Sequence, residues 1–230
     1  MPIMRYGNWG RALLLFPTAQ ADLWDNERFG LIDAIAHHIE AGRLSVFCIN
    51  TINNESWMDS SLPPFEKARR QALYAGYVEH EVVPHIRRVL GDEDVRLGVS
   101  GASFGAFHAA NTFFRRPDQF DTLIAMSGFY ELWPRWLGGQ SNDDIYFNNP
   151  LWYAPRISDP RQRHLLAHSS INLLTGQGAF ENPDESRRFS RALAGSGIVH
   201  NLDVWGHDIA HDWPSWRTML DHYLDRRVGW

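Results

Sequence analysis

The sequence contains a single cysteine, Cys48, within an apolar run at 44–49. One cysteine excludes a disulfide within the chain, and a thiol among apolar residues is expected to be buried. Such cysteine usage is typical of proteins in a reducing compartment. We therefore expect the protein to be cytoplasmic.

Long hydrophobic runs are also missing. The apolar run nearest the N-terminus, 12–16, is shorter than the apolar segment of a secretory signal. No stretch approaches the roughly 20 apolar residues that a membrane-spanning helix requires. We expect neither secretion nor a membrane partner.

Neither sign of charge dominates. The chain has 22 Lys and Arg and 27 Asp and Glu, which gives a net charge of -5, and the two signs are mixed along the sequence. This balance argues against nucleic acid as a partner. Linkers rich in Pro, Gly or Ser, internal repeats and low-complexity segments are absent as well. The 230 residues, 44% of them hydrophobic, therefore predict one domain, 1–230, with 131–155 as a candidate cap-like insertion. The oligomeric state stays open, a homo-oligomer included.

Short apolar runs alternate with stretches of helical periodicity. Strands are predicted at 12–16, 44–49, 95–99, 122–126, 171–175 and 199–205. Helices are predicted at 26–41, 64–90, 104–114, 183–194 and 214–223, with a kink or break at Pro84. This alternation is typical of parallel strands covered on both faces by helices. The expected fold class is α/β, a three-layer α/β/α sandwich with a mostly parallel sheet.

A Gly-x-Ser-x-Gly motif, Gly101-Ala102-Ser103-Phe104-Gly105, lies between a predicted strand and a predicted helix. In this context the motif forms a nucleophile elbow, a sharp turn that presents the serine and needs small residues two positions on either side. By itself the motif also occurs by chance. Its position between strand and helix makes Ser103 the candidate nucleophile.

A serine nucleophile needs a histidine base and a carboxylate that orients the histidine. Both follow Ser103 in the order serine, acid, histidine. Glu181 is the preferred acid, because the alternative, Asp184, is explained as a first-turn carboxylate of the helix that begins near Pro183. His211 is the preferred base and His207 the alternative. We discount a metal site built on this histidine pair, since the segment reads as a loop, and we expect no metal and no cofactor.

The tetrahedral intermediate of acyl transfer needs backbone N–H donors for its oxyanion. The Phe104 amide, next to the nucleophile at a helix N-terminus, is one expected donor. A second is expected from the loop Pro17-Thr18-Ala19-Gln20, which follows the first predicted strand.

Several segments together resemble the esterase D-like branch of the α/β-hydrolase superfamily. They are Glu81-Val82-Val83-Pro84-His85-Ile86, the elbow with Pro117-Asp118-Gln119-Phe120 and Met126-Ser127-Gly128 behind it, and His211-Asp212-Trp213-Pro214-Ser215-Trp216-Arg217. The resemblance implies the α/β-hydrolase fold. It also implies that His211, which matches the family's His-Asp-Trp signature, is the base.

The chain departs from this family at two places. Pro17-Thr18 stand where many members have His-Gly, which makes Ala19 the expected second oxyanion donor. Ser56-Trp57 match a segment near the family's site, but Met58 replaces a tyrosine. The residues expected to contact the substrate are Thr18, Gln20, Trp57 and Trp136, the last within the aromatic-rich segment 131–155.

The predicted function is therefore that of a serine carboxylesterase, which cleaves a small ester through an acyl-enzyme on Ser103. An acyltransferase would use the same residues with an alcohol in place of water. A catalytically silent relative that serves as a binding module is the alternative from another class.

Overall fold

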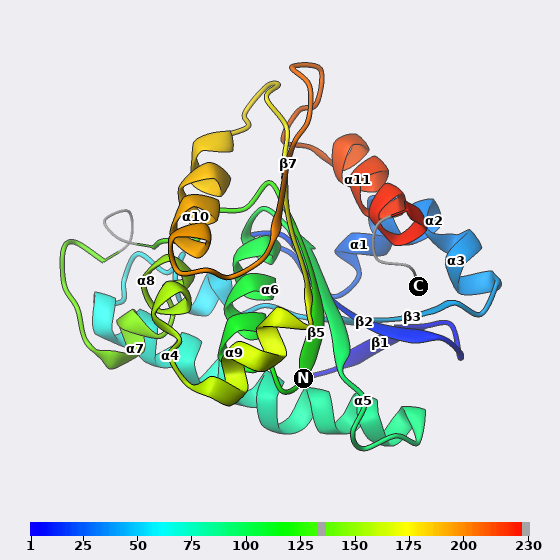
Figure 1. The fold of residues 1–230 in the computed structure, drawn as a ribbon, viewed down its shortest axis with the longest axis horizontal. Coiled ribbons are helices and arrows are strands. Elements are labelled where there is room, and N and C mark those ends of the chain that lie inside the picture. Colours follow the sequence, from blue (N-terminus) through cyan, green and yellow to red (C-terminus); the bar gives the residue numbers. More distant parts are fainter. Residues whose placement is uncertain (133–136, 227–230) are drawn as a thin grey trace.

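The computed structural model describes residues 1–132 and 137–226, and its centre is one seven-stranded sheet (Figure 1). The strand order is β1-β3-β2-β4-β5-β6-β7. β1 is antiparallel to β3, and the other neighbours pair in parallel. The strands are β1 (Ile3–Tyr6), β2 (Arg11–Phe16), β3 (Leu44–Ile49), β4 (Leu97–Ala102), β5 (Phe120–Met126), β6 (Ser170–Thr175) and β7 (Asn201–Val204). The predicted mostly parallel sheet is confirmed.

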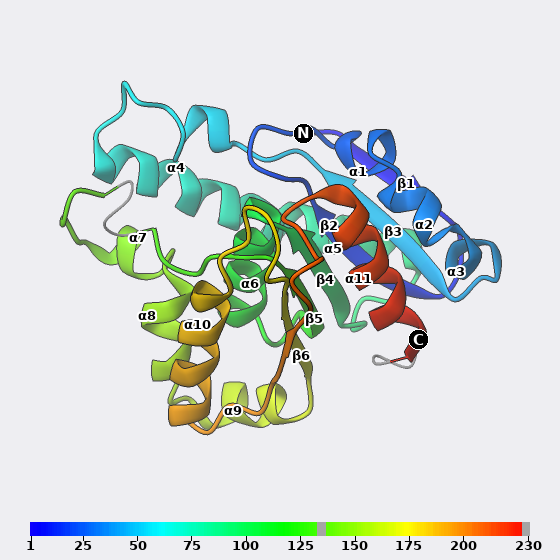
Figure 2. The same ribbon diagram turned by 90° about the horizontal axis from the view of Figure 1, so that it is seen from above.

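Helices cover both faces of the sheet (Figures 1 and 2). On one face lie α1 (Asp25–Arg28), α2 (Leu31–Ala34), α3 (Ala36–Glu40) and α11 (Trp213–Arg226). On the other lie α4 (Pro64–Tyr77), α5 (Val83–Leu90), α6 (Phe104–Arg115), α9 (Pro160–Ala167) and α10 (Pro183–Gly195), with α7 (Asp143–Tyr146) and α8 (Pro150–Tyr153) beyond them. A separate apolar cluster fills each side, because alternate strand residues point to opposite faces. The three-layer α/β/α sandwich is confirmed.

The strand register sets where the functional loops lie. Phe16 pairs with Gly101, Ala102 with Met126, and Met126 in turn with Leu174. The carboxyl ends of β2, β4, β5 and β6 are therefore level, and the residues that follow them meet at one edge of the sheet. In α/β folds this edge is where reactive groups gather.

The prediction of one continuous helix at 26–41 is wrong. The segment forms three short helices, because Gly30 adopts φ 72° and Ile35 leaves helical geometry at φ -108° and ψ 10°. Apolar spacing alone does not show such breaks. The predicted strand 95–99 lies further along the chain, at Leu97–Ala102, and runs directly into Ser103.

Pro84 distorts the predicted helix 64–90 without ending it. A π-helical turn, Val78–Val82, connects α4 to α5, so the chain adapts to the N–H that proline lacks. Gly91 ends α5 in the left-handed conformation at φ 71°. β1 and the helices α7, α8 and α9 had no counterpart among the predicted elements.

Cys48 is fully buried in β3, and burial raises the pKa of its thiol to about 12. The expected burial of this thiol is confirmed. Within residues 1–132 and 137–226, no helix combines the length and the apolar character needed to span a membrane.

Candidate active site

Ser103 lies in a strained turn between β4 and α6, with φ 57° and ψ -119°. The two motif glycines allow this turn. A Cβ on Gly101 would lie 2.4 Å from the carbonyl carbon of Gly105, and one on Gly105 would lie 2.7 Å from the Pro17 carbonyl oxygen. The elbow therefore packs directly against the end of β2, where the loop 17–20 begins.

The Ser103 hydroxyl lies 2.9 Å from Nε2 of His211, within hydrogen-bond distance. On the other side of the same ring, Nδ1 lies 3.6 Å from Oε2 of Glu181. The three residues come from three loops, which follow β4, β6 and β7. A hydroxyl, an imidazole and a carboxylate in this order can move a proton from the hydroxyl to the ring and stabilise the resulting positive charge.

The Glu181 carboxylate is almost fully enclosed, with its side chain only 1% exposed. Ser127 donates a short hydrogen bond to Oε1, and Thr175 donates one of 3.2 Å to Oε2. Burial raises the pKa of Glu181, but His211 and the Ser127 hydrogen bond outweigh it, so that the net pKa lies below the ordinary value. The carboxylate is thus held ionised beside the histidine.

Ser127 has a positive φ of 51° at the end of β5. Its hydroxyl donates to Glu181 and accepts a hydrogen bond of 3.0 Å from Nε1 of Trp216. Trp216 also packs edge-on against the His211 ring, with 5.1 Å between centroids. Ser127 belongs to a segment that resembles the family pattern, but that pattern did not predict its contact with Glu181.

The two loops that carry Glu181 and His211 dock against each other through their backbones. The Gly178 amide donates to the Ile209 carbonyl at 2.8 Å, and the His211 amide donates to the Ala179 carbonyl at 2.9 Å. A Cβ on Gly176 would lie 2.1 Å from the Ile209 oxygen. Gly176 and Gly178 therefore allow the two loops to approach closely. This pair of glycines is a signal in the sequence that could have predicted the contact between the loops.

The two alternative residues are both exposed. His207 is exposed in the β7–α11 loop. Asp184 is 82% exposed in the first turn of α10 and forms an ion pair of 3.1 Å with Arg187. The geometry therefore groups Ser103 with the preferred residues, His211 and Glu181.

A cavity of about 320 Å³ opens beside Ser103. Both expected oxyanion residues, Ala19 and Phe104, line it, and Phe104 is the first residue of α6, where the helix dipole is positive. The remaining lining residues are Met58, Ser103, Ser127, Gly128, Phe129, Phe180, Asn182, Glu185 and His211. The cavity thus combines an apolar wall with the polar groups of the site.

Of the four residues expected to contact the substrate, the three that the structure describes, Thr18, Gln20 and Trp57, do not line this cavity. Thr18 donates to Asp25 at 3.4 Å, and Gln20 is exposed. Trp57 is fully buried, and its indole N–H donates to Gln71 at 2.9 Å. Trp57 does not line the cavity, whereas its neighbour Met58 does, and a contact of Trp57 with the substrate stays a prediction. Trp136 lies outside the described residues.

A larger cavity, about 670 Å³, lies against α4, α6 and the segment 143–162. The aromatic residues Tyr146, Phe147 and Tyr153 of the candidate cap line it. Of the residues described, Ser103, His211 and Glu181 are not part of its lining. These three aromatic residues therefore border a different cavity from the one beside the serine, whereas Trp152 packs against the apolar cluster that contains Phe104.

A buried polar chain supports the loop that holds Ala19. Asn53 donates to the Ala19 carbonyl at 2.8 Å, and its Oδ1 lies 2.9 Å from Nε2 of His108. His108 lies in α6, and its Nδ1 is 3.4 Å from Nε2 of Gln71. These residues were not predicted from the sequence, because a histidine on an apolar helix belongs to no motif.

Comparisons with known proteins identify the family and the fold of the chain. The family described as "Putative esterase" matches residues 33–227, while no curated protein matches the sequence. A solved ferulic acid esterase is 20% identical with a TM-score of 0.69, covering 94% of this chain and 84% of its own. An S-formylglutathione hydrolase from Agrobacterium tumefaciens is 14% identical with a TM-score of 0.70, covering 95% and 83%.

A third solved structure, the S-formylglutathione hydrolase of Staphylococcus aureus, is 16% identical with a TM-score of 0.63, covering 95% of this chain and 81% of its own. At sequence identities this low, structural similarity establishes the shared fold alone. The predicted α/β-hydrolase fold is thereby confirmed. The family match covers far more than half of the sequence. The chain therefore belongs to the "Putative esterase" family.

Proposed function

We propose that this protein is a serine carboxylesterase that hydrolyses a small ester through an acyl-enzyme on Ser103. The carrying observation is the 2.9 Å contact between the Ser103 hydroxyl and Nε2 of His211, in an elbow held at φ 57°. Strained backbone of this kind persists where the surroundings enforce it, and it is common at active sites. Membership of an esterase family supports a small ester as the substrate.

In the first half of the reaction, the Ser103 oxygen attacks the acyl carbon and its proton passes to Nε2 of His211. The carbonyl oxygen becomes an oxyanion, for which we assign the backbone amides of Ala19 and Phe104 as donors. When the intermediate collapses, the ester C–O bond breaks and His211 returns the proton to the leaving alcohol. The acyl group then remains on Ser103.

In the second half, a water molecule attacks the acyl carbon and gives its proton to His211. The bond between acyl carbon and Ser103 breaks, the serine regains the proton, and the carboxylic acid leaves. Throughout, Glu181 faces Nδ1 of His211 and stabilises the imidazolium. Its present separation of 3.6 Å is longer than a hydrogen bond, and such contacts often shorten when substrate binds.

A fluorophosphonate reagent, which reacts with activated serines, tests the proposal directly. We expect one covalent adduct on Ser103 by mass spectrometry, none in Ser103→Ala, and parallel loss of 4-nitrophenyl acetate hydrolysis. His211→Ala should also abolish turnover, while His207→Ala should retain most of it, because His207 is exposed. A folded parent protein without an adduct would favour the silent binding module.

A transferase is distinguished by adding a primary alcohol to the ester assay. The proposed hydrolase yields the free acid and no new ester at modest alcohol concentration. Dominant transfer to the alcohol would identify an acyltransferase with the same residues.

A further inference from the structure

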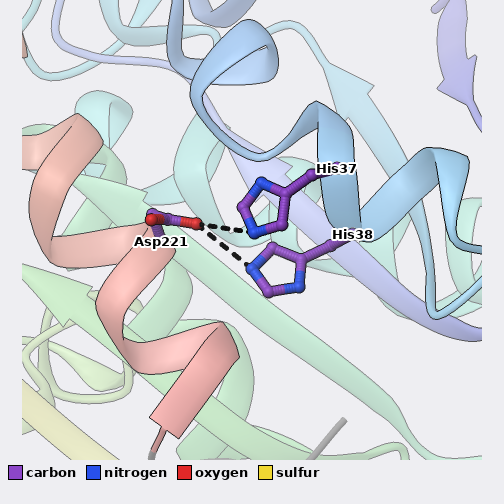
Figure 3. Close-up of side chains that lie close together, drawn as sticks. All are labelled: His37, His38 and Asp221. Atoms are coloured by element: carbon purple, nitrogen blue, oxygen red, sulfur yellow. Dashed lines mark hydrogen bonds and ion pairs between the residues drawn. The ribbon is translucent and has the colours of Figure 1, made fainter.

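A second group of chemically active side chains lies far from Ser103, between α3 and α11. His37 and His38 are consecutive residues of α3, and Asp221 is a residue of α11 (Figure 3). All three side chains turn toward one another across the gap between the two helices (Figure 3). Segments more than 180 residues apart in the chain therefore converge at one point.

The geometry of the group suits a metal ion. Nε2 of His37 lies 3.4 Å and Nε2 of His38 lies 3.2 Å from the same oxygen, Oδ1 of Asp221. One ligand atom from each residue falls within 4.8 Å of the others. Two ligands bound at about 2.0–2.1 Å to a tetrahedral zinc ion are about 3.3–3.4 Å apart. The histidine-to-carboxylate distances already match that spacing.

The burial of the three residues differs in a way that serves metal binding. The His38 side chain is 2% exposed, which fixes its ring, whereas those of His37 and Asp221 are 54% and 40% exposed. An ion can therefore enter from solvent, and water can complete its coordination.

We propose that His37, His38 and Asp221 bind a divalent transition-metal ion, with Zn²⁺ as the ion that fits the ligand set best. Two imidazoles and one carboxylate are ligands that zinc accepts readily, and hard ions such as Mg²⁺ prefer oxygen alone. Because the ligands come from α3 and α11, the ion joins these two helices. This site is a departure from the expectation of no metal, and it is independent of the proposed ester hydrolysis.

Calorimetric titration of chelator-treated, dialysed protein with ZnCl₂ tests the site. We expect one ion per chain, and a rise in melting temperature with zinc, since an ion that binds only the folded state stabilises it. His37→Ala and Asp221→Asn should each weaken zinc binding at least tenfold. Both residues are partly exposed, so these variants are expected to fold, whereas the buried His38 is left intact.

His164→Ala is the matched control, because His164 of α9 and His168, which follows the end of that helix, form another histidine pair, with 4.3 Å between ring centroids. This control should bind zinc as the parent does. Co²⁺ supplies a second readout, since its visible absorption reports the coordination geometry and should be lost in Asp221→Asn. Absence of zinc binding at micromolar concentration, or unchanged binding in both His37→Ala and Asp221→Asn, would overturn the proposal.

Discussion

The Glu181 carboxylate combines near-complete burial with three polar partners, Ser127, Thr175 and His211. A buried charge is costly unless such partners compensate it. Here His211 and the Ser127 hydrogen bond outweigh burial and hold the pKa of Glu181 below its ordinary value of 4.5. At the residue scale, this environment is what separates Glu181 from the exposed Asp184.

We predict that Glu181→Gln lowers kcat by about 10³-fold or more, because the neutral amide no longer stabilises the imidazolium. Asp184→Asn should change kcat less than about twofold, since its contact is the exposed Arg187. Steady-state hydrolysis of 4-nitrophenyl acetate measures both. Equal, mild effects would place the acid elsewhere.

The same pair of variants has a pH signature. A lowered pKa in the folded state means that the ionised carboxylate stabilises the fold above pH 4.5, and that this stabilisation is lost as the pH falls through the folded-state pKa. The difference in unfolding free energy between parent and Glu181→Gln should therefore be constant near neutrality and shrink in acid. Urea unfolding at several pH values measures it, with Asp184→Asn as the control.

Glu181 also shows how far residue-level reasoning reaches. It was preferred because Asp184 had an alternative explanation at a helix N-terminus, and the structure brings Glu181 to His211. The Ser127 hydroxyl, by contrast, lies 54 residues from its partner in the chain. Only the parallel pairing of β5 and β6 creates that contact, and no local pattern encodes it.

At the element scale, α6 carries a fully buried histidine that links it to the loop at Ala19. Burial lowers the pKa of His108 to about 3, and Asn53 and Gln71 lie within hydrogen-bond distance of its two ring nitrogens. The neutral ring thus connects the helix behind Ser103 to the carbonyl of Ala19 through Asn53. Movement of these hydrogen-bonded side chains would displace Ala19, a proposed oxyanion donor.

We predict that His108 makes the fold sensitive to acid. Because its folded-state pKa is lowered from 6.5, the unfolded chain binds the proton more readily, and stability falls as the pH drops from about 6.5 toward 3. The contribution approaches about 1.4 kcal/mol per pH unit. His108→Gln should reduce this slope in urea unfolding between pH 7 and pH 4. An unchanged slope would show that the folded protein protonates His108 freely.

The elbow glycines allow a second test at this scale. Gly105→Ala would place a Cβ 2.7 Å from the Pro17 oxygen and 2.8 Å from the Phe16 oxygen, so the end of β2 must shift. We predict a loss of about 1–3 kcal/mol of stability and a larger loss of esterase activity. Thermal unfolding and ester hydrolysis measure the two effects.

Gly76→Ala is the matched control for Gly105→Ala. Gly76 lies inside α4, and its Cβ would meet nothing within 4 Å. Alanine there should raise stability by about 0.5–1 kcal/mol and leave activity unchanged. Tolerance of alanine at Gly105 as well would mean that the elbow does not need the close approach to β2.

The helices show where sequence patterns lose precision. Periodicity identified 183–194 and 104–114 to within a residue or two, since each is one amphipathic or buried helix with clear ends. The segment 26–41 has the same periodicity but breaks at Gly30 and Ile35. After these breaks α3 packs against β3, and such packing is not encoded in the spacing of apolar residues.

At the scale of the whole molecule, parallel pairing of β2, β4, β5 and β6 collects loops that are remote in sequence. The order of the motifs and the ends of the strands could be predicted from the sequence, and they sufficed to predict that these loops meet at one edge of the sheet. The shapes of the cavities could not be predicted, because they depend on how side chains from several elements pack. In the candidate cap at 131–155, the aromatic residues Tyr146, Phe147 and Tyr153 border the larger cavity, whereas Trp152 packs against the apolar cluster that contains Phe104.

The two cavities differ in size and would hold acyl chains of different length. The preference of the enzyme for acyl-chain length therefore shows which cavity the acyl group enters. The cavity beside Ser103, about 320 Å³, is near the small end of ligand sites, so we predict that kcat/KM for 4-nitrophenyl acetate or butyrate exceeds that for decanoate by about tenfold or more. Phe129→Ala, which enlarges this cavity, should shift the preference toward longer chains. Phe147→Ala, at the larger cavity of about 670 Å³, should leave it unchanged. The reverse result would show that the acyl chain reaches the larger cavity.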